Sequence, residues 1–189
     1  MTSKKVIIVL GSPRKNGNSS ALAQKASEGI KSMGVEFESF YLHGMDIKPC
    51  AACDTCKKAI DKYCITDDDM QILYPKILEA GALLIASPIY WFTVSAQTKL
   101  FMDRCRAFLS SEGNTLTGKR IGIILTYGDT DPYVSGAVNA LRTFQDAFNY
   151  VKAPIIGTVY GSASEAGEIK ANHEIMEKAY ELGKKLVSS

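Results

Sequence analysis

Four cysteines stand close together in the chain and could act as one set of ligands. Two residues separate Cys50 from Cys53 and Cys53 from Cys56, and Cys64 follows after seven more. This spacing places three thiolates within two turns of chain, and a short loop brings the fourth, Cys64, back towards them. Such a set suits an iron-sulfur cubane with one thiolate per iron. Structural zinc usually takes two Cys-x2-Cys pairs across a longer spacer. The alternatives are a zinc site, a pair of redox-active thiols, or inert surface thiols that bind no metal.

A second group of polar residues runs from Gly11 to Ser20, between a predicted strand and a predicted helix. Free backbone N–H groups and the helix dipole favour an anion at such a place. The side chains that could bind phosphate oxygens are those of Ser12, Arg14, Asn18, Ser19 and Ser20. The run has neither the Walker pattern nor the Gly-x-Gly-x-x-Gly pattern, so it favours a monophosphate over a pyrophosphate. In the alternative interpretation, Asn18 or Ser19 only caps the helix.

The composition limits the context in which these groups work. The 189 residues carry 22 Lys and Arg against 20 Asp and Glu, a net charge of +2, and 46% are hydrophobic. The length predicts one domain over residues 1–189, and the charge balance argues against a nucleic-acid partner. No apolar stretch approaches the roughly 18 residues that cross a bilayer. We therefore expect no membrane partner, and a cytoplasmic protein whose thiols stay reduced.

Positioning the polar groups requires strands that alternate with helices. Five short apolar runs predict buried strands, and five longer segments have helical periodicity. The strands are Lys5–Leu10, Val35–Leu42, Ala82–Ser87, Arg120–Thr126 and Pro154–Tyr160, and the helices are Ser19–Met33, Asp69–Ala80, Ala96–Leu109, Tyr133–Tyr150 and Glu165–Val187. Pro75 predicts that the second helix starts late or kinks. The pattern is that of an α/β protein with a parallel sheet covered by helices on both faces.

Two segments interrupt this alternation. Residues 44–67 are too long for an ordinary connection between a strand and a helix, and this predicted insertion loop holds the four cysteines. Residues 88–93, Pro-Ile-Tyr-Trp-Phe-Thr, place aromatic side chains where the third strand ends, which indicates a stacking surface or an interface. Ligands of a doubly wound sheet bind at the carboxyl ends of its strands. The loops after the first, third and fourth strands should therefore meet at one site.

Together these motifs resemble a known family. Gly-Ser-Pro-Arg-x-x-Gly-Asn-Ser after the first strand, Ser-Pro-Ile-Tyr after the third and the cysteine loop are similar to the NADPH-dependent FMN reductases, in particular to their iron-sulfur flavoprotein branch. The resemblance implies a flavodoxin-like, doubly wound, five-stranded parallel sheet in the order 2-1-3-4-5. It also implies a homodimer or homotetramer, FMN, and a 4Fe-4S cluster on Cys50, Cys53, Cys56 and Cys64. The FMN phosphate would lie on Ser12, Arg14, Asn18, Ser19 and Ser20, and the isoalloxazine ring on Pro88, Ile89, Tyr90, Trp91, Phe92, Thr126, Tyr127, Gly128 and Asp129.

An isoalloxazine ring needs a flat apolar wall and backbone N–H groups near N1, N5 and O2. Residues 89–92 and 127–129 could supply both, and Gly128 would permit close approach of the backbone. Asp129 either accepts a hydrogen bond from ring N3–H or is only a turn residue. Dimer contact is the alternative role of the aromatic run. Hydride transfer to a flavin requires no acid-base side chain, so we assign no catalytic residue.

These expectations lead to two functions and a weaker third. In the first, FMN and the cluster move electrons between a two-electron donor or acceptor and a one-electron carrier such as ferredoxin. In the second, NAD(P)H reduces quinones, free flavin or other small acceptors, and the cysteines hold no cluster or act as thiols. The third is a non-catalytic carrier. Because no second nucleotide motif is present, NAD(P)H would dock briefly at the flavin, which predicts ping-pong kinetics.

The remaining cysteine and the histidines lie outside these motifs. We expect Cys105 to be a core residue, and His43 and His173 to be surface residues.

Overall fold

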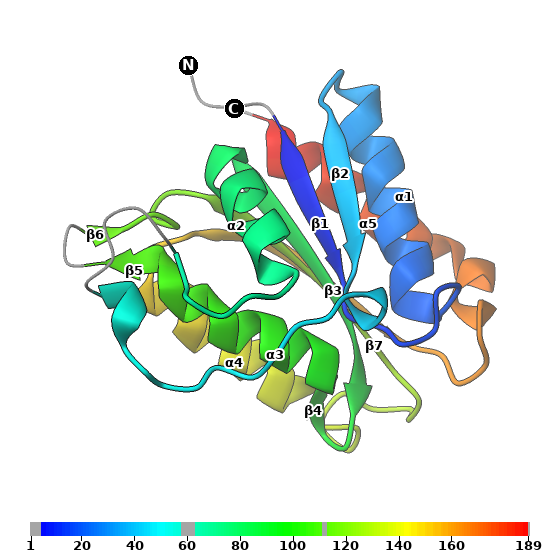
Figure 1. The fold of residues 1–189 in the computed structure, drawn as a ribbon. Helices are drawn as coiled ribbons and strands as arrows, with labels where there is room; N and C mark the ends of the chain where they lie inside the picture. The colour runs from blue at the N-terminus through cyan, green and yellow to red at the C-terminus, as the bar shows by residue number, and fades with distance from the viewer. Residues whose placement is uncertain (1–4, 58–62, 111–112, 189) are drawn as a thin grey trace.

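The computed structural model describes residues 5–57, 63–110 and 113–188. These residues form a parallel sheet of five long strands: β1 (Val6–Leu10), β2 (Phe37–Tyr41), β3 (Ala82–Tyr90), β7 (Arg120–Tyr127) and β8 (Ile155–Ser162). They lie in the order β2-β1-β3-β7-β8, and each neighbouring pair is parallel (Figure 1). Because these are the five predicted strands in chain order, the predicted order 2-1-3-4-5 is confirmed.

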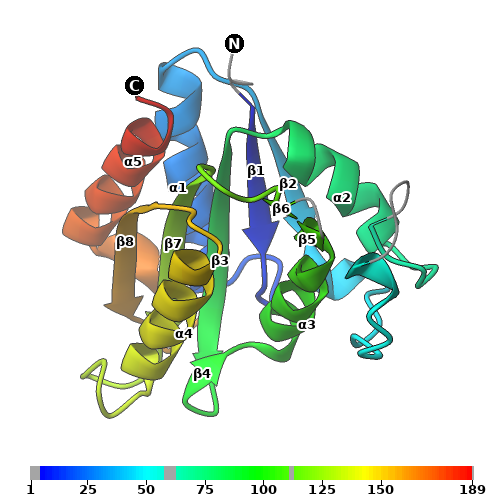
Figure 2. The same cartoon turned by 90° about the vertical axis from the view of Figure 1, so that its left-hand side faces the viewer.

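Helices cover both faces of the sheet, as Figures 1 and 2 show. One face carries α1 (Asn18–Ser32) and α5 (His173–Val187), and the other carries α2 (Met70–Glu79), α3 (Ala96–Arg104) and α4 (Ala137–Tyr150). Alternate residues of β1 enter opposite cores: Ile7 and Val9 pack on the side of α2, α3 and α4, and Ile8 packs on the side of α1 and α5. Burial on both sides explains why the central strands β1, β3 and β7 are continuous apolar runs. The prediction that all five strands are buried is wrong for β2, which has no buried residue because it lies at the edge of the sheet.

The two helices of the first face pack unusually closely through glycines. A methyl group on Gly29 of α1 would lie 2.1 Å from the Tyr180 carbonyl oxygen, and one on Gly183 of α5 would lie 1.9 Å from the Ala26 carbonyl oxygen. Both distances are far inside van der Waals contact, so the helices approach this closely because neither glycine has a side chain. The position of α1 is therefore set by α5.

The third strand runs beyond its predicted end. It extends past the predicted boundary and turns back as β4 (Thr93–Val94), so the aromatic run forms a hairpin. Trp91 and Phe92 at its tip have φ angles of 48° and 68°, a region that few residues other than glycine adopt. The Asn139 side chain donates a hydrogen bond to the Phe92 carbonyl at 3.1 Å, and a methyl group on Gly136 would lie 2.4 Å from the Phe92 Cα. The start of α4 thus supports the strained tip.

The fourth helix begins later than predicted. The Asp131 carboxylate accepts hydrogen bonds from the N–H groups of Tyr133 (2.7 Å) and Val134 (3.2 Å), which folds the predicted first turn into a capped loop. Gly136 then has a φ of 79°, and regular helix starts at the next residue. The sequence periodicity over these residues was therefore misleading, because the local carboxylate competes with helix formation.

Other boundaries also differ from prediction. The last predicted helix is divided into a 3-10 helix, Glu168–Ala171, and α5, which Asn172 caps by accepting from the N–H of Ile175 at 3.1 Å. The second helix does not start late, since α2 contains Pro75 in its interior. After α3 the chain forms a 3-10 helix, Cys105–Phe108, and a short hairpin of β5 (Leu109–Ser110) and β6 (Gly113–Asn114).

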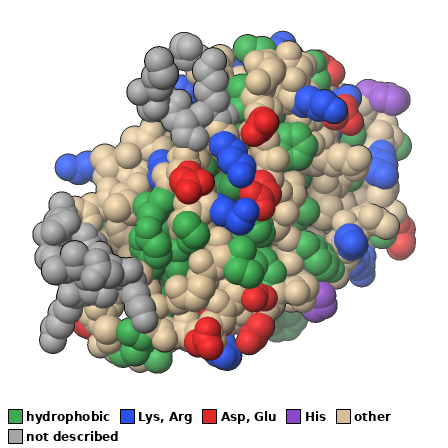
Figure 3. Space-filling model, turned by 45° about the horizontal axis from the view of Figure 1, so that its top comes forward, with side chains coloured by type: hydrophobic (Ala, Val, Ile, Leu, Met, Phe, Trp, Pro, Cys, Tyr) green, Lys and Arg blue, Asp and Glu red, His purple; other side chains and the backbone are tan. Residues whose placement is uncertain are grey.

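Charged side chains of both signs are mixed on the surface. On the face that Figure 3 presents, Lys and Arg side chains lie among Asp and Glu side chains, with apolar side chains between them. This mixture accords with the net charge of +2. Within the described ranges, no helix is both long enough and apolar enough to span a bilayer.

Candidate functional site

A cavity of about 260 Å³ lies at the carboxyl ends of β1, β3 and β7. Three predicted loops line it, together with a fourth segment that follows β8. The lining residues are Ser12, Arg14, Gly17, Asn18, Ser19, Pro88, Ile89, Tyr90, Thr126, Tyr127, Gly128, Ala163 and Ser164. Ten of the fourteen residues predicted to contact a cofactor are thus brought together. The other four, Ser20, Trp91, Phe92 and Asp129, do not line this cavity.

The first turn of α1 brings unused hydrogen-bond donors to one end of the cavity. The hydroxyl oxygens of Ser19 and Ser20 are buried and have no partner in the described structure. The N-cap residue is Gly17, and no side chain caps the helix, so the interpretation of Asn18 or Ser19 as a simple cap is wrong. A buried hydroxyl without a partner costs about 1–3 kcal/mol. An anion at the helix N-terminus would supply the missing acceptor for Ser19, which lines the cavity.

The loop before α1 is folded into a tight curve. Ser12 Oγ accepts a hydrogen bond from the N–H of Arg14 at 3.0 Å, and the N–H of Gly17 donates to the Arg14 carbonyl at 2.9 Å. A methyl group on Gly17 would lie only 2.9 Å from Ser12 Oγ, so this position requires glycine. From the neighbouring strand β2, the Tyr41 hydroxyl donates to the Pro13 carbonyl at 2.6 Å. The curve is therefore formed before any ligand arrives.

Asn18 makes contacts within the protein that its sequence position did not reveal. Its Nδ2 donates to the carbonyl oxygens of Ala163 (3.2 Å) and Glu165 (2.9 Å), and its Oδ1 accepts from the N–H of Ile169 at 3.3 Å. The side-chain amide thus ties α1 to the chain that follows β8. What Asn18 offers to a ligand is its main-chain N–H, in the uncapped first turn of α1.

The other end of the cavity has an apolar wall and, at Gly128, a backbone that no side chain covers. Pro88, Ile89 and Tyr90 supply the wall from β3. A methyl group on Gly128 would meet only Ser164 Oγ, at an ordinary 3.6 Å, so the protein itself does not require glycine there and the missing side chain leaves room in the cavity. Nearby, the Asp129 carboxylate accepts from the N–H of Thr130 at 2.7 Å, the local contact of a turn residue.

The fourth wall of the cavity escaped the sequence analysis. Residues 162–169, here called the β8 strap, contribute Ala163 and Ser164 to the lining. A signal was present, because β8 ends at the same sheet edge and the run of small residues Gly-Ser-Ala-Ser spans its end. Only the loops after the first, third and fourth strands were predicted to form the site.

The aromatic side chains at the hairpin tip are exposed and lie outside the lining of the cavity. Trp91 is 91% exposed and Phe92 is 53% exposed, whereas Tyr90 is 42% exposed and lines the cavity. Contact of either tip residue with a flavin ring stays a prediction. A role of these side chains in a subunit interface stays a prediction.

The four cysteines predicted as ligands line a second cavity, of about 540 Å³, between the cysteine loop, α3 and α4. Cys50 and Cys53 are exposed, and Cys56 and Cys64 are partly buried. Across residues 5–57, 63–110 and 113–188, no group of three or more Cys, His, Asp or Glu side chains is arranged to hold a metal ion. Residues 58–62 of this loop lie outside the described residues. The thiols are suitable donors that share one cavity, but they are not drawn together in a ligating arrangement.

The environments of these thiols differ. Hydrogen bonds from Thr55 lower the pKa of Cys53. Burial alone would raise the pKa of Cys64, but hydrogen bonds from Thr66 help to outweigh it and the net pKa is lowered. Burial raises the pKa of Cys56. Two of the four groups are thus biased towards the thiolate, which is the form that binds metals.

Cys105 and the two histidines lie as the sequence analysis expected. Cys105 packs against the main core, and burial raises the pKa of its thiol to about 12. His43 and His173 are exposed, and a ring nitrogen of His43 lies 3.1 Å from the side-chain nitrogen of Gln97. None of the three residues lines the cavity at the sheet edge.

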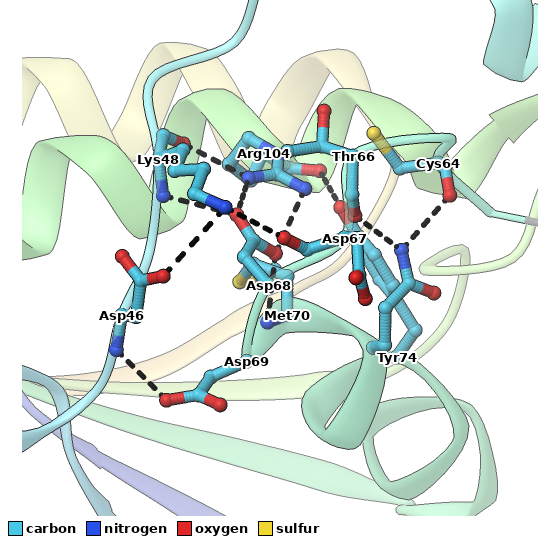
Figure 4. Close-up of polar contacts among 11 residues, drawn as sticks. Asp46, Lys48, Cys64, Thr66, Asp67, Asp68, Asp69, Met70, Tyr74 and Arg104 are labelled. Carbon is cyan, nitrogen blue, oxygen red and sulfur yellow. Dashed lines mark hydrogen bonds and ion pairs between the residues drawn. The ribbon is translucent and has the colours of Figure 1, made fainter.

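A buried ion pair closes the base of the cysteine loop (Figure 4). Arg104 of α3 donates to both oxygens of the Asp68 carboxylate and to the Lys48 carbonyl at 2.9 Å. The same carboxylate accepts from the N–H groups of Lys48 (2.9 Å) and Met70 (3.1 Å), and these bonds keep its pKa lowered despite its burial. Because Lys48 precedes the first cysteine and Asp68 follows the last, Arg104 joins both ends of the loop. Sequence periodicity gave no sign of this pair.

Comparisons with known proteins identify relatives of the chain. A family described as NADPH-dependent FMN reductase matches residues 4–168. An iron-sulfur flavoprotein of Archaeoglobus fulgidus is 32% identical over 98% of this chain and 80% of its own length. A putative NAD(P)H-dependent FMN-containing oxidoreductase of Bacillus subtilis is 27% identical over 96% of this chain and 97% of its own length. Among solved structures, an NAD(P)H:quinone oxidoreductase of Methanothermobacter marburgensis has a TM-score of 0.78 at 17% identity, covering 98% of this chain and 96% of that one, which supports the shared fold.

Proposed function

The chain belongs to the NADPH-dependent FMN reductase family, and from this premise we propose that the cavity at the carboxyl edge of its sheet binds FMN and serves a nicotinamide donor and a small-molecule acceptor in turn. The protein is an FMN-dependent oxidoreductase. The observation that carries the assignment of the cavity is the uncapped first turn of α1, where the buried Ser19 hydroxyl has no partner. These residues suit a phosphate, and the wall of residues 88–90 suits an aromatic ring.

Each end of the cavity has a separate task in this proposal. At the phosphate end, the main-chain N–H groups of the first helical turn and the Ser19 hydroxyl donate hydrogen bonds, and Arg14 at the rim neutralises charge. At the ring end, residues 88–90 exclude water from one side of the ligand and the Gly128 backbone lies close to it. When bound, FMN supplies the two-electron chemistry by accepting a hydride and passing electrons to an acceptor.

The cavity walls also determine how a second substrate reaches the flavin. Hydride transfer to a flavin requires no acid or base side chain, so the protein contributes position and electrostatics. We propose NAD(P)H as the donor, in keeping with the description of the Bacillus subtilis relative. Donor and acceptor then share the open side of the cavity and bind alternately.

The test of this proposal is steady-state turnover by flavin-loaded protein with NADH or NADPH and a quinone. We expect one FMN per chain and parallel double-reciprocal lines, because the donor must leave before the acceptor enters. Stopped-flow bleaching of the flavin by NAD(P)H without acceptor should be as fast as turnover or faster. A protein that takes up no FMN, or holds FMN that no nicotinamide nucleotide reduces, would contradict the assignment.

We further propose that the four cysteines carry an iron-sulfur cluster, so that electrons could pass singly to a carrier such as ferredoxin. Two observations support this: the donor set of Cys50, Cys53, Cys56 and Cys64 shares one cavity, and relatives are described as iron-sulfur flavoproteins. Such a cluster would supply one-electron transfer. The alternative, a small-molecule reductase whose thiols hold no cluster, is favoured by the separation of these thiols in the described structure.

Iron and acid-labile sulfide, measured after anaerobic reconstitution, decide between these alternatives. We expect close to four irons per chain in the native protein and under a tenth of that after Cys53→Ser, since a cubane needs one thiolate per iron. Cys105→Ala is the matched control and should keep its iron. Cys105 lines the same cavity but is not one of the four predicted ligands, and burial raises the pKa of its thiol, which disfavours the thiolate. Native protein that contains flavin but no iron would establish the alternative.

A further inference from the structure

The β8 strap holds the backbone of the ring end in one orientation. Three consecutive carbonyl groups, those of residues 127–129, accept hydrogen bonds from three consecutive residues of the strap. The donor and acceptor pairs are the Ala163 N–H to the Tyr127 carbonyl (2.8 Å), the Ser164 hydroxyl to the Gly128 carbonyl (2.9 Å), and the Ser162 hydroxyl to the Asp129 carbonyl. The strap therefore fixes three adjoining peptide groups beside the cavity.

The orientation of each carbonyl also fixes the N–H of the following residue. A trans peptide is planar and directs its C=O and N–H to opposite sides, and no described peptide bond is cis. Because the Gly128 carbonyl faces Ser164, the N–H of Asp129 points away from the strap and has no partner among the described residues. The next N–H, of Thr130, already donates to the Asp129 carboxylate at 2.7 Å. The Gly128–Asp129 peptide is thus the one of these two that keeps a donor for a ligand.

The β8 strap is held by two sets of hydrogen bonds. The Asn18 side chain of α1 bonds to residues 163, 165 and 169 of the strap. Within the strap, the Glu168 carboxylate accepts from the N–H groups of Ser164 (2.7 Å) and Glu165 (2.8 Å). These contacts determine where the Ser164 hydroxyl lies before any ligand is present. Ser164 also lines the cavity, so a bound ring would shield its hydrogen bond from water.

We propose that Ser164 is a positioning residue for the flavin. Gly128 lines the cavity although Asp129 does not, and by holding the Gly128 carbonyl Ser164 orients the N–H of the same peptide group towards the ring edge that becomes negative on reduction. The inference rests on the proposed binding of FMN in this cavity. Negative charge appears at the N1 and O2 edge when the flavin is reduced. A hydrogen bond to an ionised acceptor is about twice as strong as one to a neutral acceptor. Ser164 therefore favours the reduced cofactor over the oxidised one without contacting the reacting atoms.

The test compares the affinities of oxidised and reduced FMN for the native protein and Ser164→Ala. Removing the hydroxyl releases the Gly128 carbonyl, and we expect the affinity for reduced FMN to fall about tenfold further than the affinity for oxidised FMN. A tenfold difference lowers the two-electron midpoint potential by about 30 mV, which a reference dye can measure. Ser164→Thr keeps the hydroxyl and should restore the native potential.

Ser162→Ala is the matched control, since it removes the same group from the same strap. Its hydroxyl holds the Asp129 carbonyl, and the N–H of that peptide is already bonded to the Asp129 side chain. We expect a change in the affinity ratio below about threefold. An unchanged ratio in Ser164→Ala, or equal shifts in both alanine variants, would overturn the role of Ser164. Failure of the native protein to bind FMN at all would instead overturn the proposed function.

Discussion

Replacing Ser19 with Asp is expected to weaken the binding of FMN by about 100-fold or more. The substitution removes a buried hydroxyl that has no partner within the protein and puts a carboxylate in its place at the helix N-terminus. A hydrogen bond to a charged group contributes roughly 1.5–3 kcal/mol, and a like charge beside a phosphate adds repulsion of its own. The two effects together exceed the ~2.7 kcal/mol that corresponds to 100-fold. Titration of the apoprotein with FMN, followed by flavin fluorescence, measures the loss.

Riboflavin separates a phosphate contact from a general disturbance of the cavity. It lacks the phosphate, so its weaker affinity should change by less than about threefold in Ser19→Asp if that end of the cavity binds phosphate. Ser32→Asp is the matched control, because it adds the same charge to the last residue of the same helix. It should leave FMN affinity unaltered and cost only a few tenths of a kcal/mol in stability. Equal losses for FMN and riboflavin would place the phosphate elsewhere.

The largest effect on stability is expected from Arg104→Met. The substitution leaves the Asp68 carboxylate buried without its cation and the Lys48 carbonyl without its donor. Breaking a buried ion pair on one side costs about 3–5 kcal/mol, a large share of the ~5–15 kcal/mol by which a folded protein is stable. For a chain of this length, we expect the melting temperature to fall by roughly 6–20 °C. Urea unfolding measures the free energy directly.

Two controls identify the buried pair as the cause. Lys99→Ala breaks an exposed pair on the same helix, Lys99 to Asp103 at 2.6 Å, and should cost no more than about 0.5 kcal/mol. The double variant Arg104→Met/Asp68→Leu removes both charges and should recover part of the stability lost in the single variant. A loss below 1 kcal/mol in the single variant would show that the pair contributes little.

The architecture of the sheet could be predicted because its physics is local. Strands buried on both faces must be apolar throughout, so they stand out in the sequence, and the carboxyl-edge rule then brings three loops to one site. The candidate phosphate-binding loop, residues 11–20, was recognisable for the same reason: its hydroxyls, Gly17 and the helix that follows are contiguous in the chain.

The rest of the site depends on contacts between distant segments. The Asn18 side chain bonds to residues 145 and 147 positions further along the chain, and an asparagine at a helix start reads locally as a cap. Arg104 reads locally as an exposed helix residue, because nothing near it in the sequence reveals the carboxylate that it meets across the fold. The β8 strap was missed because its polar residues acquire their role only when β7 lies beside β8.

The close packing of α1 against α5 at Gly29 and Gly183 has a consequence for the candidate site. Gly29 lies eleven residues beyond Asn18 in α1, about 16 Å along a stiff rod. Because α1 is held against α5 at Gly29, a displacement of the helix at that contact also displaces its N-terminal turn. The C-terminal helix α5 thus helps to determine where the first turn of α1, the proposed phosphate site, lies relative to the sheet. If FMN binds as proposed, the position of its hydrogen-bond donors depends in part on two glycines that lie outside the cavity.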